Sequence, residues 1–186
     1  MTQSLKNLES NRLLFRAFTV SDAPRIHELL QEKAIIDNTL SIPYPYKNGM
    51  AEEWISTHQD QLAFGDYKYA IVLKKTNALI GAIEIVVTEE FKHGCLGYWI
   101  GKPYWGKGYG TEMLARILQF GFDDLNLHRI YAEHFDNNIA SARVMEKNGM
   151  IPEGILREHK IKDGEFINSN IKGILVSEWN LREGNL

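Results

Sequence analysis

The sequence has few of the features that mark secreted, membrane and nucleic-acid-binding proteins. Its 186 residues include one cysteine, Cys95, which excludes an internal disulfide framework and suits the reducing cytoplasm. No apolar run approaches the roughly 20 residues of a membrane span, and the polar start, Met1 to Glu9, lacks the apolar core of a secretion signal. The six histidines show no metal-ligand spacing, and the net charge of −3 offers no basic field to a nucleic acid. We therefore expect a cytoplasmic protein with no metal, membrane or nucleic acid among its partners.

The rest of the composition is that of an ordinary soluble domain. Hydrophobic residues make up 44% of the chain and charged residues 24%. A chain of this length can bury a sizeable core, and no repeat, low-complexity tract or charged linker divides it. We expect residues 1–186 to form a single domain.

A glycine-rich stretch, Trp105 to Thr111, stands between two apolar segments. The segment before it is typical of a strand, and the segment after it, from Met113 onward, repeats at helical spacing. Glycines let a backbone turn tightly and let a ligand come close. The order strand, glycine loop, helix presents backbone N–H groups and a helix N-terminus to an anion. It indicates a pyrophosphate site, and a plain turn between two core elements is the alternative.

Two familiar nucleotide-binding loops do not fit the spacing. A Walker loop ends in a lysine followed by serine or threonine, whereas Lys107 lies between glycines. The dinucleotide fingerprint requires two residues before its last glycine, but only Tyr109 separates Gly108 from Gly110. The pyrophosphate must therefore belong to another kind of ligand.

Apolar periodicity and turn signals predict an α/β (α+β) fold with one central sheet. Helices are expected after Ser21 or Asp22, at 50–64, after the glycine loop and at 138–147, and strands at 13–18, 69–73, 79–88, 95–100, 129–135, 151–159 and 166–176. In the second helix we expect Trp54, Ile55, Leu62 and Phe64 to be mostly buried, and Gly149 is expected to close the last helix. The short turns between residues 69 and 100 imply an antiparallel meander. The prediction is a strongly twisted, mixed but mostly antiparallel sheet of about seven strands with about four helices.

Four segments together resemble the GNAT N-acetyltransferase superfamily. Leu96–Glu112 is similar to its acetyl-CoA signature, and Asp136–Met150 is similar to its second CoA-contacting motif. Asn11–Arg16 and Ile42–Tyr46 are similar to segments of the RimJ/RimL-type branch, which acetylates protein N-termini. The resemblance covers nearly the whole chain, and it implies the GNAT fold with acetyl-CoA as co-substrate.

The resemblance assigns the glycine loop to acetyl-CoA. It implies that N–H groups of the loop bind the pyrophosphate and that the strand edge before the loop pairs with the pantetheine arm. The implied CoA-binding residues are Tyr98, Trp99, Ile100, Gly106, Lys107, Gly108, Tyr109, Gly110, Thr111, Asn138 and Ser141. Lys107 could equally be a solvated surface residue, Asn138 a helix N-cap, and Tyr98 and Trp99 core or pocket wall.

The proton donor to the departing thiolate is assigned to Ser141 or water. In this branch a serine at that position lies near the thioester sulfur, and an ordinary helix-surface serine is the alternative. Many GNAT enzymes carry a tyrosine four residues later, where this chain has Met145. That departure removes the usual general acid.

The leading candidate for the general base is Glu84. Its apolar strand could raise the pKa of the carboxyl group, although the side chain could equally be solvated. Glu133 and His134 are weaker candidates. Several related enzymes carry a glutamate near the position of Cys95, which could be an acyl-accepting nucleophile or, more commonly, a buried structural thiol.

The sequence therefore predicts an enzyme that moves the acetyl group directly from the thioester to a primary amine. The expected acceptor is the N-terminal α-amino group of a protein, of the ribosomal-protein type. Such an amine has a pKa of about 7.7–8.0, against about 10.4 for lysine, so a weak base suffices. A small amine (polyamine, antibiotic or amino acid) and a non-catalytic acyl-CoA sensor are the alternatives. A homo-oligomer is also compatible with the sequence, because the closing strands of such folds often pair.

Overall fold

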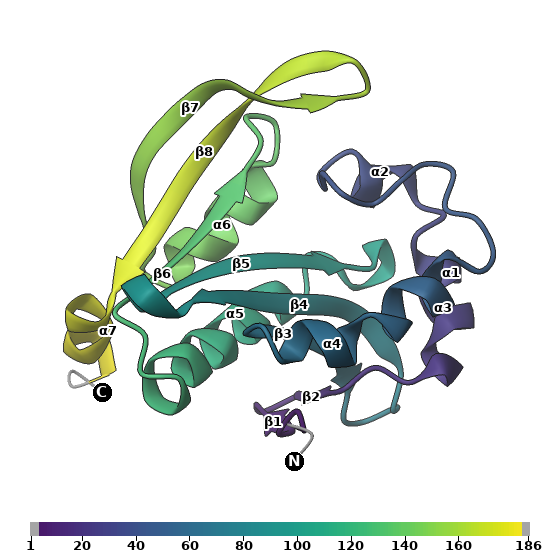
Figure 1. Cartoon of the computed structure of the whole chain (residues 1–186), viewed down its shortest axis with the longest axis horizontal. Coiled ribbons are helices and arrows are strands. Elements are labelled where there is room, and N and C mark those ends of the chain that lie inside the picture. Colours follow the sequence, from purple (N-terminus) through teal and green to yellow (C-terminus); the bar gives the residue numbers. More distant parts are fainter. Residues whose placement is uncertain (1–3, 184–186) are drawn as a thin grey trace.

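An eight-stranded mixed sheet forms the centre of the protein, a computed structural model in which residues 4–183 are described (Figure 1). The strand order is β1-β2-β3-β4-β5-β6-β8-β7, and only the β5–β6 pair is parallel among these described strands. The strands are β1 (Leu8–Glu9), β2 (Leu13–Arg16), β3 (Asp66–Leu73), β4 (Leu79–Thr88), β5 (His93–Ile100), β6 (Arg129–His134), β7 (Ile151–Lys162) and β8 (Glu165–Leu175). The predicted meander is β3 to β5. The strand that the sequence did not predict is β1, which is too short to leave an alternating pattern.

The helices are shorter and more numerous than predicted. They are α1 (Ala23–Leu29), α2 (Lys33–Ile36), α3 (Met50–Ser56), α4 (His58–Leu62), α5 (Tyr109–Gln119), α6 (Ile139–Lys147) and α7 (Val176–Glu183). The single helix expected at 50–64 is divided at Thr57, whose hydroxyl donates to the Trp54 carbonyl at 2.8 Å. The prediction that Phe64 is buried was wrong, because it lies past the end of α4 and is 85% exposed.

The predicted ends of two helices have different outcomes. Neither Ser21 nor Asp22 caps α1 through its side chain. Instead, Asp22 accepts the Thr19 N–H at 2.8 Å and pairs with Arg16 of β2 at 2.7 Å. Gly149 does close α6, with φ of +83° and the following N–H donating to the Met145 carbonyl at 3.1 Å.

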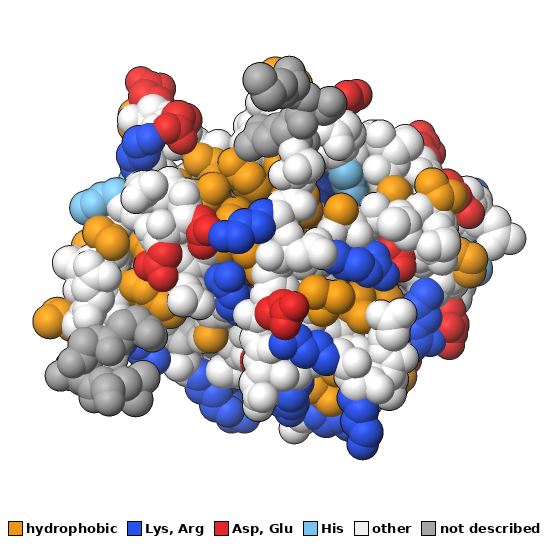
Figure 2. Space-filling view, turned by 90° about the horizontal axis from the view of Figure 1, so that it is seen from below, with side chains coloured by type: hydrophobic (Ala, Val, Ile, Leu, Met, Phe, Trp, Pro, Cys, Tyr) orange, Lys and Arg blue, Asp and Glu red, His pale blue; other side chains and the backbone are white. Residues whose placement is uncertain are grey.

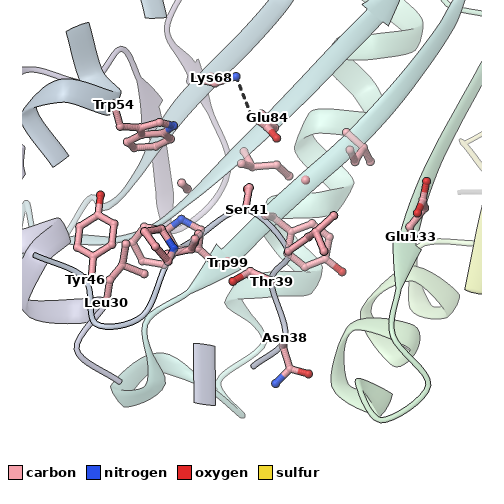
Figure 3. A pocket seen from close by; sticks show the side chains of 18 of the residues that line it. Leu30, Asn38, Thr39, Ser41, Tyr46, Trp54, Lys68, Glu84, Trp99 and Glu133 are labelled. Carbon is pink, nitrogen blue, oxygen red and sulfur yellow. Dashed lines mark ion pairs between the residues drawn. The ribbon is translucent and has the colours of Figure 1, made fainter. Parts of the chain in front are cut away.

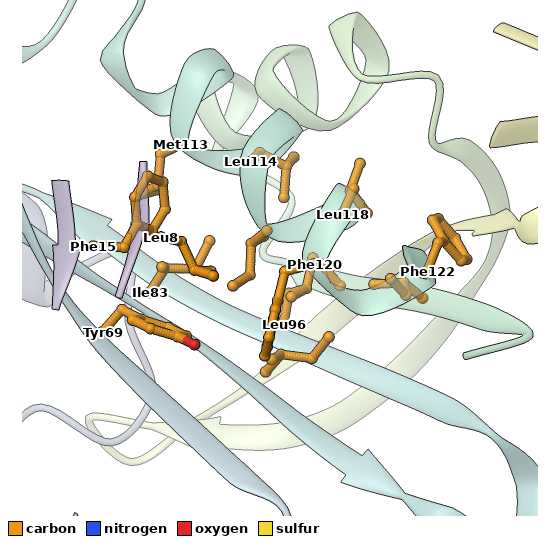
Figure 4. Packing of buried hydrophobic residues seen from close by; sticks show 14 of the residues in the cluster. Leu8, Phe15, Tyr69, Ile83, Leu96, Met113, Leu114, Leu118, Phe120 and Phe122 are labelled. Atoms are coloured by element: carbon orange, nitrogen blue, oxygen red, sulfur yellow. The ribbon is translucent and has the colours of Figure 1, made fainter. Parts of the chain in front are cut away.

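The two faces of the sheet carry different helices and different apolar clusters. One face packs against α5 and α7, around side chains such as Phe15, Tyr69, Leu114 and Phe120 (Figure 4). The other face packs against α1, α2 and α3. We call them the α5 face and the α1 face.

Strand alternation assigns each site side chain of β4 and β5 to one of these faces. Leu96 belongs to the α5 cluster and Trp99 to the α1 cluster. Tyr98 therefore extends on the α5 face, whereas Gly97 opens onto the α1 face. Glu84 lies opposite Gly97 in the register of β4 and β5, so its side chain is also on the α1 face.

Charges are unevenly spread over the face shown in Figure 2. Lys and Arg side chains gather along its lower edge, and most Asp and Glu side chains lie above them. Among the described residues, no helix is both long and apolar enough to cross a membrane.

Candidate active site between the splayed strands

The glycine loop joins β5 to α5 through two left-handed residues. Gly106 has φ of +73° and Gly108 has φ of +77°, a region that favours glycine. α5 starts at Tyr109, immediately after Gly108. The first N–H groups of a helix have no partner in the preceding turn, so those of α5 are available to an anion.

Arg12 of the loop before β2 braces the glycine loop, a role that the sequence did not reveal. Its backbone N–H and its Nε each donate to the Glu112 carboxylate at 2.6 Å, and its Nη1 donates to the Lys107 carbonyl at 3.0 Å. The guanidinium also lies 4.4 Å from the centre of the Tyr109 ring. Burial alone would raise the pKa of Glu112, but hydrogen bonds from Arg12 and Ser10 outweigh it and hold that pKa below its ordinary value. Because Arg12 and Glu112 are 100 residues apart in the sequence, no local pattern predicts this contact.

A cleft of about 510 Å³ lies between the glycine loop, the end of β5 and the start of α6. It exists because β5 and β6 pair only as far as Leu96 and Ala132 and then separate. The Gly101 N–H donates to the Ile80 carbonyl of β4, so alternation directs the Trp99 backbone toward β4 as well. The backbone groups of Tyr98 and Ile100 then face the cleft, and the Ile100 carbonyl accepts the Trp105 indole N–H at 2.5 Å.

Three predicted residues, one in β5 and two at the start of α6, meet beside this cleft. The Asn138 side chain caps α6 by accepting the Ser141 N–H at 3.1 Å. The Ser141 hydroxyl lies 2.7 Å from the Tyr98 hydroxyl. Burial raises the pKa of Tyr98 to about 12, although the hydrogen bond to Ser141 lowers it. Tyr98 therefore remains protonated at neutral pH, and its hydroxyl forms a hydrogen-bonded pair with that of Ser141. Thr111 also lines the cleft, and its carbonyl accepts the Asn148 amide at 3.2 Å.

The cationic side chains that line the cleft are not the one that the sequence analysis named. Lys107 turns back, and its Nζ donates to the Pro103 carbonyl at 2.7 Å, so its side chain braces the loop. Arg143 and Lys147, four residues apart on α6, do line the cleft. Their spacing within the second motif was the available signal.

A second cavity, of about 740 Å³, opens on the α1 face of the same strands (Figure 3). Its floor includes Glu84, which is 38% exposed and pairs with the 8% exposed Lys68 at 2.8 Å. Lys68 also pairs with Asp66. The Glu84 carboxylate lies over Gly97, since a Cβ atom added at Gly97 would come within 2.7 Å of it. The absence of a side chain at Gly97 therefore gives the carboxylate its place beside the strand.

The other candidate bases line the same cavity and, like Glu84, have partners. Glu133 pairs with Lys160 at 2.9 Å and accepts the Ser169 hydroxyl. Burial raises the pKa of Glu133, but these contacts outweigh it and hold the net pKa below its usual value. The His134 Nδ1 lies 2.9 Å from the Phe135 carbonyl. Burial raises the pKa of the Cys95 thiol, which disfavours the thiolate that a nucleophile needs.

The two cavities meet at the residues that line both, which are Asn38 and Thr39, Leu96 to Trp99 on β5, and Glu133 on β6. A carboxylate, Glu84, therefore faces the junction from the α1 side and a hydroxyl pair faces it from the α5 side. Such an arrangement can accept a proton on one face and donate one on the other. Among the described residues, no group of three or more His, Cys, Asp or Glu side chains could hold a metal ion.

Comparison with known proteins gives concordant matches. The family model described as an acetyltransferase (GNAT) domain matches residues 12–151. An uncharacterized N-acetyltransferase of Bacillus subtilis, YnaD, is 33% identical over 183 residues, covering 94% of this chain and 99% of its own. A spermidine N(1)-acetyltransferase of Vibrio cholerae is 26% identical over 171 residues, covering 91% and 96%. The solved structure of RimL, a ribosomal L7/L12 α-N-protein acetyltransferase in complex with coenzyme A, superposes with a TM-score of 0.81 at 20% identity, over 93% of this chain and 99% of that one. The last match is evidence of a shared fold.

Proposed function

This chain belongs to the GNAT family of N-acetyltransferases, as its motifs predict, and we propose that it acetylates the N-terminal α-amino group of a protein with acetyl-CoA as donor. The observation that carries the proposal is the junction at Gly97 and Tyr98, where a cleft for the donor on the α5 side meets a cavity for the acceptor on the α1 side.

The donor would bind in the cleft between the splayed strands. We assign the pyrophosphate to the N–H groups of Gly106, Lys107, Gly108, Gly110 and Thr111, which the left-handed glycines and the α5 N-terminus support. Tyr109 lines the wall beside them. Arg143 and Lys147 are suited to the remaining phosphate charge. Strand addition to the edge of β5 would use the backbone groups of Tyr98 and Ile100. Asn138 would contribute its amide group, since its oxygen already caps α6.

Glu84 is the proposed general base, acting directly or through one water. An α-amino group has a pKa near 8, so a substantial fraction is already neutral at physiological pH and a weak base can remove the remaining proton. Lys68 fixes the carboxylate and balances its charge.

The Tyr98–Ser141 hydroxyl pair is the proposed proton source for the departing thiolate. The pair lies on the α5 side, opposite Glu84, so the two proton transfers would occur on different faces of the sheet. This assignment would replace the tyrosine that many GNAT enzymes carry at the position of Met145. Met145 itself is 1% exposed and belongs to the core. A phenolic hydroxyl is thus available from β5 in place of one from α6.

A protein N-terminus is favoured because the acceptor cavity extends from α3 across β4 and β5 to β7, well beyond the space that one amine fills. The RimL structure is named for α-N-protein acetylation, and this supports the same reading. The second candidate is a small polyamine, since a relative of full length is named a spermidine N(1)-acetyltransferase.

The test is a screen of CoA thiol release with N-terminal peptides, including ribosomal ones, beside spermidine and free amino acids. Matched peptides with a blocked N-terminus are the control. The proposal predicts CoA release only with free N-termini and an acetyl group located there by mass spectrometry. Turnover of spermidine alone would favour the polyamine, and tight acetyl-CoA binding without any turnover would favour a sensor.

A further inference from the structure

The acceptor cavity is divided into a charged end and an aromatic end. In Figure 3, Trp54, Tyr46, Leu30 and Trp99 gather on one side, whereas Glu84 and Glu133 lie toward the other. Both ends adjoin the donor cleft, because Glu133 at the charged end and Trp99 at the aromatic end each line both cavities. An amine that enters at the charged end would thus have the aromatic end within the same continuous space.

The aromatic side chains of this end are held in place by packing against one another and against the core. Trp54 and Phe18 pack edge to face with ring centres 4.9 Å apart, and Trp54 packs on His58 at 4.4 Å. Trp99 and Tyr46 are 8% and 6% exposed, so their orientations are fixed by the α1-face cluster. Tightly packed rings of this kind form a defined apolar pocket.

Ionised groups are scarce at this end. His58 stays neutral above about pH 5, because burial and then the charge of Lys68 lower its pKa to about 4. The hydroxyl oxygen of Thr57 lies 3.1 Å from the side-chain oxygen of Gln61, so these polar groups contact each other. Glu53 lines the cavity from the exposed side of α3 and lies at its rim. A second ammonium group would have no buried carboxylate to meet it among the described residues of the aromatic end.

We propose that the aromatic end binds the side chain of the acceptor's first residue, and that the preferred acceptors are N-termini beginning with a large apolar or aromatic residue. The inference rests on the proposed function. It names methionine, leucine and phenylalanine as good first residues, and alanine, serine, lysine and polyamines as poor acceptors. Apolar burial at the aromatic end and ammonium binding near Glu84 would together orient the amine toward the thioester.

The test uses peptides that differ only in the first residue: Phe, Leu, Met, Ala, Ser or Lys, with spermidine as a further acceptor. Two quantities are measured: kcat/KM from CoA thiol release, and the Kd of each peptide for CoA-saturated protein by calorimetry. Discrimination in apolar pockets is typically tenfold to about 200-fold per missing methylene group. We therefore expect Phe and Leu peptides to exceed the Ala peptide by about tenfold or more in kcat/KM.

Variants locate the effect. Trp54→Ala removes a wall of the pocket and is expected to abolish most of the Phe-over-Ala preference, whereas Trp54→Phe keeps a ring and most of the preference. Ile42 lies in a loop that packs on the same cluster, and Ile42→Asp is expected to raise kcat/KM for the Lys peptide relative to the Leu peptide. This second variant tests the pocket even if Trp54→Ala does not fold. Phe64→Ala is the matched control, because Phe64 is exposed and lies outside the cavity lining. Thermal unfolding verifies that each variant folds.

The outcomes separate the inference from the function on which it rests. Turnover with Ala or Ser peptides equal to or above that with Leu and Phe overturns the inference and leaves acetylation of N-termini intact. Preferential binding of Phe and Leu peptides without any turnover refutes the proposed function and supports the pocket. An unchanged preference in Trp54→Ala and Ile42→Asp also overturns the pocket assignment.

Discussion

Replacing Gly106 with alanine tests the anion-binding loop against a matched backbone control. Gly106 has φ of +73°, and no protein atom lies within 4 Å of an added Cβ. Gly164, in the turn between β7 and β8, has φ of +87° and equally open surroundings. Alanine at either position therefore costs left-handed backbone strain of roughly 1–2 kcal/mol and no steric clash.

The two variants should lose similar stability and differ in ligand binding. For a chain of this size, a loss of 1 kcal/mol lowers Tm by about 2–4 °C, so each variant should melt about 2–8 °C lower. Gly106 lines the cleft, and a methyl group added there stands in open space, where we expect it to hinder the approach of a phosphate. Loss of one hydrogen bond to a charged group costs about 1.5–3 kcal/mol, which is roughly a tenfold to 150-fold rise in Kd.

The assay pairs calorimetric titration of acetyl-CoA with thermal unfolding of the free protein. The expected result is a lower Tm in both variants and weaker acetyl-CoA binding in Gly106→Ala alone. Wild-type affinity in Gly106→Ala, at a Tm that matches Gly164→Ala, would refute the assignment of the loop to the pyrophosphate.

Three further predictions concern ionisable groups. Glu84→Gln should lower kcat/KM about 10²-fold at pH 7 and progressively less above pH 8, where the amine is already neutral; an unaltered pH profile would remove Glu84 as the base. Tyr98→Phe and Ser141→Ala should each lower kcat with acetyl-CoA affinity nearly intact, and the Tyr98→Phe profile should parallel the wild type up to pH 10 because the phenol titrates near pH 12; equal turnover in either variant would make that hydroxyl structural. His58, with its pKa lowered to about 4, binds fewer protons in the folded state than in the unfolded state between pH 4 and 6.5, so stability should fall as the pH falls through this window. After allowance for partial solvent screening the loss is up to about 2 kcal/mol. Denaturant unfolding should show a flatter pH dependence in His58→Phe, and an unchanged dependence would contradict the assignment to His58.

Local signals predicted much of this fold because they act over short distances. The apolar runs gave β3 to β6 and the two helices of the site, and Gly149 marked the end of α6 through its left-handed conformation. The helix expected at 50–64 failed because the side chain of Thr57 bonds to the backbone carbonyl of Trp54, three residues earlier, and competes with helix continuation. Phe64 consequently lies past the last turn of α4 and is exposed to solvent.

The candidate site residues could be named from the sequence, whereas contacts between two distant segments could not. Ser141 and Asn138 lie within one motif. The Glu84–Lys68 pair depends on the register of β3 and β4, and the bracing of Glu112 by Arg12 depends on the packing of β2 beside α5. Tyr98 was expected as wall or backbone, and its hydroxyl partner became evident only when α6 was placed over β5. Spacing alone contains no information on such contacts.

The separation of β5 from β6 also bears on the order in which substrates bind and products leave. Under the proposed function, donor and acceptor would reach the junction from the two cavities that meet there. Neither substrate would have to bind first, and CoA and the acetylated product could dissociate independently. Initial-rate plots should therefore intersect, as expected for a ternary complex without a covalent acetyl-enzyme, and a product-like acetylated peptide should not compete with acetyl-CoA. Binding or release in one cavity would thus leave the other cavity accessible.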